Sequence, residues 1–262
     1  MSYLAPNNRL STKKQWDNIW SGEHIRNLTF DPEQPTFSDL HNLFQMLLPK
    51  DKNFKFLEVG CYPGSYMWYF NKYFGYQVSG LEYVDWCCES TREKLQTVGI
   101  EGEVIHGDLF EYNPSSAKKL WDVVASFGFI EHFTDVVPVI KKHLDLLKPD
   151  GYLILVIPNH HGLNGRILKN VDTAKYKIHN LMSYDEMRQA LKITGKARVI
   201  SGGYFGRIGF WNTDLYPLLK KKGRLIYIPV RGILWMCERV GRILPNSAFL
   251  SPNIAMVAKK LE

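Results

Sequence analysis

Residues 56–65 read FLEVGCYPGS: a short apolar run that contains an acid, then a turn with two glycines. An apolar pattern at helical spacing follows, with Tyr66, Met67, Phe70 and Phe74. A strand that feeds a helix through a glycine-rich turn is how α/β proteins bring the backbone close to a nucleotide. The stretch therefore predicts an α/β fold with a nucleotide-like ligand at the end of its first strand.

The spacing of the two glycines narrows the choice of ligand. Dinucleotide folds use G-x-G-x-x-G, but Tyr62 stands at the second glycine position and the third position falls in the aromatic helix. Glu58, Gly60 and Gly64 instead follow an acid-x-Gly-x-x-x-Gly pattern. The spacing disfavours an NAD-dependent oxidoreductase. A purely structural turn with two glycines is the alternative.

Two further apolar runs also end in acids. Residues 76–82 end in Glu82, about 20 residues after the loop, where dinucleotide folds place an acid on the ribose hydroxyls. Residues 103–108 end in Asp108, which is positioned to accept a hydrogen bond from an adenine amine. Asp85 is a nearby alternative to Glu82. A solvated strand end, or for Asp108 a capped turn, is the alternative to a binding role.

The next segments carry a family resemblance. Residues 120–133 read LWDVVASFGFIEHF, and residues 147–153 read LKPDGYL, followed by an apolar run to Asn159. In this order the motifs resemble class I S-adenosylmethionine (SAM) methyltransferases, and most closely the branch that modifies small molecules and glycans. The resemblance spans residues 54–200, with a last strand predicted at 253–258.

The resemblance implies a Rossmann-like α/β fold: a seven-stranded sheet with helices on both faces and an antiparallel last strand. It also implies a single domain over residues 1–262. Within it we predict an N-terminal helical cap (1–50), a SAM-binding core (51–203), an insert or lid before the last strand (204–250) and the last strand itself (251–260).

The resemblance also assigns the cofactor, S-adenosyl-L-methionine, with S-adenosyl-L-homocysteine (SAH) as the product. Its residues would be Glu58, Gly60, Cys61 and Gly64 around the methionine part, Glu82 and Tyr83 at the ribose, Asp108 and Leu109 at the adenine, and Ser126 and Phe127 on the floor. Tyr62-Pro63 departs from the usual loop, and Cys61 is also a candidate packing residue. Gly128 stands where some relatives carry an acid for a metal, so no metal is expected.

Methyl transfer to an alcohol needs a base for the hydroxyl proton, and histidine is the usual base near neutral pH. His132 follows the fourth predicted strand and is the first candidate. His160 and His161 follow the fifth, and Glu131 would orient a base or bind an acceptor hydroxyl. His179 precedes a capping-box motif and is interpreted as structural. A hydrogen-bonded structural role is the alternative for each histidine.

Net charge and cysteine content indicate which kinds of partner and which cellular compartment suit this chain. The formal charge is +7, concentrated late in the chain, which suits acidic partners or a solvated basic surface. The four cysteines show no C-x-x-C, and the first six residues lack a signal-peptide pattern, which favours a reduced, cytoplasmic protein.

In the insert, apolar residues from Ile233 to Leu244 trace one helical face. Core packing is favoured for it, with a substrate lid, a dimer contact or an anionic membrane surface as alternatives.

The leading hypothesis is SAM-dependent O-methyl transfer, by in-line displacement, to a small molecule, a sugar or a lipid-linked glycan. A methyltransferase of structured RNA is an alternative because of the net charge, although the chain has no RNA-binding motif. A non-catalytic scaffold with the same fold is a second alternative, and the intact cofactor acids argue against it. The acceptor, the methylated atom, the acting histidine, the role of the insert, the oligomeric state and a peripheral membrane location stay open.

Overall fold

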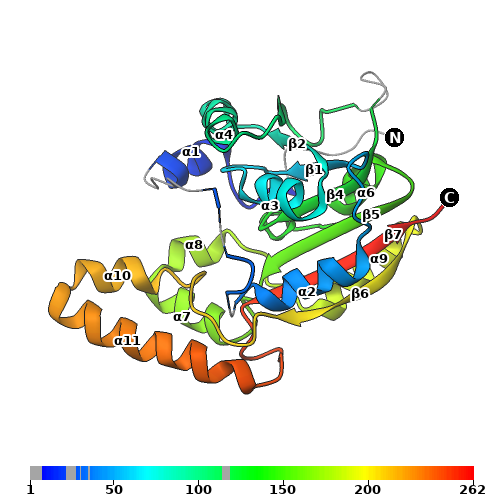
Figure 1. The fold of residues 1–262 in the computed structure, drawn as a ribbon. Coiled ribbons are helices and arrows are strands. Elements are labelled where there is room, and N and C mark those ends of the chain that lie inside the picture. Colours follow the sequence, from blue (N-terminus) through cyan, green and yellow to red (C-terminus); the bar gives the residue numbers. More distant parts are fainter. Residues whose placement is uncertain (1–7, 22–27, 30, 35, 114–118) are drawn as a thin grey trace.

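The fold is described by a computed structural model for residues 8–21, 28–29, 31–34, 36–113 and 119–262. The expectation about the first six residues therefore lies outside the described part. Seven strands form one sheet in the order β3-β2-β1-β4-β5-β7-β6. Strand β7 runs antiparallel to both of its neighbours, while β1 to β5 pair in parallel. This confirms the predicted α/β sheet with its antiparallel last strand (Figure 1).

The central strands form mainly where apolar residues run continuously, as expected for strands covered on both faces. Their bounds are β1 Lys55–Val59, β2 Gln77–Glu82, β3 Glu103–His106, β4 Trp121–Phe127, β5 Leu147–Pro158, β6 Ala197–Phe205 and β7 Asn253–Lys260. Strand β5 starts before its apolar run, since Leu147 already pairs with Trp121. A register irregularity between Trp121 and Val123 then precedes the main pairing.

Successive residues of a strand point to opposite faces of the sheet, so their side chains pack into two hydrophobic cores, one on each face. Helices α2 Ser38–Leu47, α3 Ser65–Phe74 and α4 Asp85–Thr97 cover one face, and α6 Val137–Asp145 and α9 Tyr184–Thr194 cover the other. The start of α9 carries the predicted capping box, in which Ser183 and Glu186 each accept from the other's backbone N–H. The helices on both faces hold the sheet rigid, so the ends of its parallel strands form a fixed edge.

The remaining helices lie around that edge. Helix α1 Lys13–Ser21 belongs to the N-terminal cap, and α7 Leu163–Val171 and α8 Thr173–Lys177 follow β5. The insert forms a hairpin of α10 Leu215–Lys221 and α11 Arg224–Val240, followed by the short η3 Gly241–Ile243. Helix α11 has no buried residue, so the expectation that it packs into the core is wrong. It pairs with α10 at the outer edge of the molecule (Figure 1).

Candidate active site

A cavity of about 500 Å³ lies at the carboxyl ends of the parallel strands. Its walls come from the ends of β1, β2, β4 and β5 and from the loop after β3. Trp16 and Trp20 of α1 also line it. Ligands of open α/β sheets bind at this edge because the strand order reverses there, between β1 and β4.

The glycine loop adopts a backbone that other residues resist. Gly60 has φ +74°, and a β-carbon there would lie 2.9 Å from a ring carbon of Phe129. Gly64 has φ +99°, and a β-carbon there would lie 3.0 Å from the methyl group of Thr91. The loop therefore turns tightly into α3 and leaves the backbone of Gly60 facing the cavity.

Two buried acids stand at the strand ends beside this loop. Glu58 is 3% exposed, its Oε2 has no hydrogen-bond partner, and burial raises the pKa of its carboxyl well above the usual value. Glu82 is 6% exposed, and its Oε1 accepts hydrogen bonds from the N–H groups of Tyr83 and Val84. Both acids line the cavity. An orphaned carboxyl oxygen beside a tight backbone turn fits a ligand that brings its own positive charge, such as SAM, because that charge would lower the pKa of Glu58 and ionise it.

The third acid, Asp108, already has a partner within the protein for each of its carboxylate oxygens. Asp108 accepts from the N–H of Phe110 through Oδ1 and pairs with the Arg9 guanidinium through Oδ2. Arg9 also lies within 6 Å of the Tyr83, Phe110 and Phe133 rings, at 5.3, 5.6 and 5.7 Å. No pattern in the chain points to Arg9, because it is 99 residues from Asp108 in sequence. An adenine amine at Asp108 would have to share this carboxylate with Arg9.

The structure separates the other predicted cofactor residues into two groups. Tyr83, Leu109 and Phe127 line the cavity, and Phe127 stacks on Tyr66 with 3.5 Å between ring centroids. Cys61, Gly64 and Ser126 do not line it. Cys61 is fully buried in the core, with burial raising the pKa of its thiol, and it lies against Gly80. Its position supports the packing role that the sequence left open.

Three histidines gather in one part of the cavity wall, after β4, β5 and α8. The ring centroids of His132 and His160 each lie 4.6 Å from that of His179. The Nδ1 atoms of His132 and His179 lie 2.9 and 2.7 Å from the carbonyl oxygens of Ile178 and Lys175. A carbonyl can only accept, so each Nδ1 carries the proton and each Nε2 keeps a free lone pair.

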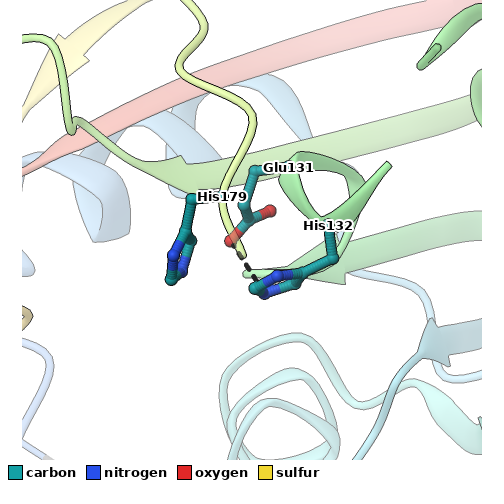
Figure 2. A group of neighbouring side chains, drawn as sticks. All are labelled: Glu131, His132 and His179. Atoms are coloured by element: carbon teal, nitrogen blue, oxygen red, sulfur yellow. Dashed lines mark ion pairs between the residues drawn. The ribbon is translucent and has the colours of Figure 1, made fainter. Parts of the chain in front are cut away.

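Burial keeps these imidazoles neutral. It lowers the pKa of His132 and of His160 to about 3, with neighbouring histidines adding to the shift, and it lowers the pKa of His179 as well. Burial also raises the pKa of Glu131 to about 8. The Oε1 of Glu131 lies 3.7 Å from the Nε2 of His132, and its Oε2 is buried without a partner. Figure 2 shows the two imidazoles converging on the Glu131 carboxyl group.

Glu131, His132 and His179 offer ligand atoms within 4.8 Å of one another, a set that a divalent cation could also use. The expectation of no metal stays a prediction. His161 lies apart from the cluster: its side chain is 46% exposed, with Nε2 3.8 Å from Glu186, and it does not line the cavity. Its neighbour His160 lines the cavity, because residues 160 and 161 stand on opposite sides of the chain after β5.

Sequence reasoning missed some residues in this part of the cavity wall. The structural role expected for His179 is incomplete, since this histidine joins His132 and His160. Lys175 and Asp214 pair at 2.9 Å in the cavity wall, which Trp211 also lines. The short basic helix α8 holds no motif, so only the tertiary structure reveals its part in the wall.

The N-terminal cap also reaches this cluster. Trp16 of α1 packs edge-on against His132, with 4.6 Å between ring centroids. The indole N–H of Trp16 donates to the Ser11 hydroxyl, which fixes the orientation of the ring. The cap therefore closes the cavity beside the candidate base.

The buried Glu131 carboxyl predicts a pH dependence of stability. Its folded pKa of about 8 exceeds the ordinary value of 4.5, so unfolding releases its proton and stability falls as pH rises through this window. His132 and His160 have lowered pKa values, so they oppose folding only below 6.5. Between pH 6.5 and 8 the Glu131 carboxyl should remove about 2 kcal/mol.

Urea unfolding at several pH values, in the wild type and in Glu131→Gln, measures this effect. The variant should lose less stability than the wild type over the same pH interval, by about 2 kcal/mol. Equal slopes in the two proteins would show that the Glu131 carboxyl is ionised in the fold.

The sheet order, the glycine loop and the strand-end acids together define a class I SAM-dependent methyltransferase. A family model for a methyltransferase domain matches residues 33–197, and the chain belongs to this family. It is therefore an enzyme whose cofactor is SAM and whose product is SAH. No curated protein matches the chain in sequence.

Solved structures share the fold at low sequence identity. A protein from Galdieria sulphuraria, described as a sarcosine dimethylglycine methyltransferase, has a TM-score of 0.62 at 17% identity. The match covers 95% of this chain and 98% of that one. Geranyl diphosphate C-methyltransferase from Streptomyces coelicolor A3(2), solved with Mg²⁺, geranyl-S-thiolodiphosphate and SAH, gives 0.58 at 11% identity, over 86% and 76%. The plantazolicin methyltransferase BpumL, solved with SAH and a desmethylPZN analog, gives 0.56 at 14% identity, over 95% and 91%.

Proposed function

We propose that this methyltransferase transfers the methyl group of SAM to a hydroxyl oxygen of a small-molecule or sugar acceptor. The observation that supports the proposal is the cluster of His132, His160 and His179 in the cavity wall. An alcohol is a weak nucleophile until its proton is removed, and each neutral imidazole keeps an unprotonated ring nitrogen that can receive it. An acceptor whose nucleophile is already a free amine would not need them.

For the displacement itself, the main task of the protein is to hold the methyl group of SAM in line with the acceptor oxygen. The methyl group leaves a sulfonium, the cation becomes a neutral thioether, and a cavity lined by Trp16, Tyr66 and Phe127 does not oppose this loss of charge. Holding two reactants in line contributes up to about 7–11 kcal/mol. We assign the proton to the Nε2 of His132, 3.7 Å from the Glu131 carboxyl group. The positive charge that forms there would lower the pKa of Glu131, and the carboxylate that results would stabilise the imidazolium. His160 is the second candidate base.

The part of the wall formed by residues 175 and 211–214 suits a hydroxyl-rich acceptor. Lys175 and Asp214 offer a donor and acceptors beside Trp211, whose side chain lines the cavity and is 56% exposed. An exposed aromatic face next to paired polar groups binds a sugar ring through its apolar face and its hydroxyls. A lipid-linked glycan is the form of acceptor that would also bring the enzyme into peripheral contact with a membrane.

A screen with radiolabelled SAM tests the proposal. The probes are a pool of free sugars, a pool of small alcohols and bulk RNA, each with wild type and with Glu82→Ala as the background control. Label should pass to the sugar or alcohol pool, and the product should show an O-methyl carbon resonance in NMR. Transfer to RNA, or an N- or C-methyl product, would contradict the proposal.

A further inference from the structure

The α10–α11 hairpin exposes an unusual amount of apolar surface. Helix α11 buries none of its 17 residues, and Leu225, Val240 and Ile243 are 94%, 65% and 84% exposed. Single exposed apolar residues are ordinary on protein surfaces, but a contiguous set marks an interaction site. Within the described residues no helix is long and apolar enough to cross a membrane.

The exposed residues occupy a defined face of the helix. Tyr227, Val230, Leu234 and Glu238 are half-buried, and their spacing of three and four residues puts them on the side that faces the rest of the protein. Exposed apolar residues lie on the rest of the helix surface: Leu225 and Met236 directly opposite, Ile228, Ile233 and Val240 to either side, and Ile243 just beyond the helix in η3. The apolar stripe of the hairpin therefore points away from the fold.

Positive charge surrounds this stripe. From Leu215 to Ile243 the chain carries one acid, Glu238, and seven basic residues: Lys220, Lys221, Lys222, Arg224, Arg231, Arg239 and Arg242. Two of the arginines lie over aromatic rings, Arg239 over Trp235 at 4.5 Å and Arg231 over Tyr227 at 5.8 Å. Long basic side chains beside an apolar stripe can lie along it and hold their charges at its border.

We propose that the α10–α11 hairpin docks on an anionic lipid surface, with α11 lying in the plane of the interface. Apolar residues on one side, Trp235 at the border and arginines beside it match the groups that such a surface offers: acyl chains below and phosphates above. A twofold contact with a second copy would place seven like charges against seven others. A nucleic acid would match the charges but leave the apolar stripe without a partner.

Docking in this way would also orient the active site. Helix α10 begins directly after Asp214, which lines the cavity together with Trp211. The cavity wall and the hairpin are therefore joined without a spacer, so a surface that holds the hairpin would also fix the orientation of the cavity. This arrangement suits an acceptor held at the lipid surface, although the docking itself does not depend on the acceptor chemistry.

Co-sedimentation with vesicles tests the proposal on the full chain without SAM or acceptor. The wild type should bind vesicles of phosphatidylcholine mixed with phosphatidylglycerol, and should not bind phosphatidylcholine alone. Arg239→Glu/Arg242→Glu should weaken binding by about tenfold or more, as expected for reversing charges near an anionic surface. Leu225→Ser/Met236→Ser should weaken it as well, because the apolar contact is lost while the charge stays.

Lys72→Glu/Lys192→Glu is the matched control, since it reverses two exposed charges on α3 and α9 and should leave binding unchanged. If this control lost as much vesicle binding as Arg239→Glu/Arg242→Glu, the loss would follow from net charge alone, and the proposal would be overturned. Absence of binding to the mixed vesicles would also overturn it, as would a dimer in sedimentation velocity that Leu225→Ser/Met236→Ser disperses. SAM binding by each variant, measured by calorimetry, separates a failure of docking from a failure of the enzyme.

Discussion

Replacing Glu82 by alanine is expected to weaken SAM binding by about a hundredfold. The role proposed for this acid is to accept two hydrogen bonds from the ribose hydroxyls, which would be worth about 3 kcal/mol together. The side chain is held in place for such a role, since it ends β2, is buried at the cavity wall, and accepts from two backbone N–H groups through Oε1. Calorimetric titration of SAM into wild type and variant measures the loss.

The alanine variant also leaves the N–H groups of Tyr83 and Val84 without their acceptor, so a second variant is needed. Glu82→Gln keeps the side-chain volume and one acceptor oxygen and should lose less affinity than alanine. Asp85→Ala is the matched control, because Asp85 lies three residues away, with its side chain 69% exposed and paired with Lys13. SAM affinity that is unchanged in Glu82→Ala would place the ribose elsewhere, and binding of NAD in place of SAM would mean that the glycine loop serves a dinucleotide.

Replacing His132 is expected to lower kcat by about 10²–10⁴-fold, the range that a positioned general base contributes. His132 is buried, it lines the cavity, its Nδ1 is fixed on the Ile178 carbonyl, and its Nε2 lies 3.7 Å from Glu131. The measurement is kcat in His132→Ala with the acceptor identified by the label-transfer screen. SAM affinity should stay near the wild-type value, because His132 is not among the acids and loop residues proposed to hold the cofactor.

Two comparisons make this result specific. His132→Asn keeps an N–H for the Ile178 carbonyl, so it should fold like the wild type and still lose the base. His161→Ala removes an exposed imidazole outside the cavity and should leave kcat unchanged. If His160→Ala carries the loss and His132→Asn does not, the base is His160. Full activity in both would mean that the acceptor loses its proton without a histidine.

The positions of the acids proposed to hold the cofactor could be predicted from the sequence, because the pattern that places them is local. Each cofactor acid stands in or directly after an apolar strand, and parallel strands bring these positions to one edge whatever the rest of the chain does. Glu58, Glu82 and Asp108 therefore reach the cavity together, as predicted. The capping box at Ser183 and the strand positions followed from local pattern in the same way.

The rest of the site could not be predicted, because it joins segments with no local signal. Arg9 reaches Asp108 across 99 residues, and His179 reaches His132 only because the chain after α8 returns to the end of the sheet. The exposure of α11 to solvent could not be predicted from the sequence either. Its apolar face is the pattern of a core helix, and whether such a face meets the sheet or the outside depends on where the chain before and after it runs.

The sequence by itself determined the class of fold, the cofactor and the acids proposed to hold it, since strand periodicity and glycine spacing act over a few residues. The tertiary structure decided which histidines share the cavity, that Cys61 packs in the core, and that the insert turns its apolar side outward. These depend on contacts between residues distant in sequence, whose free energy is set by packing of the whole domain and leaves no periodic trace along the chain.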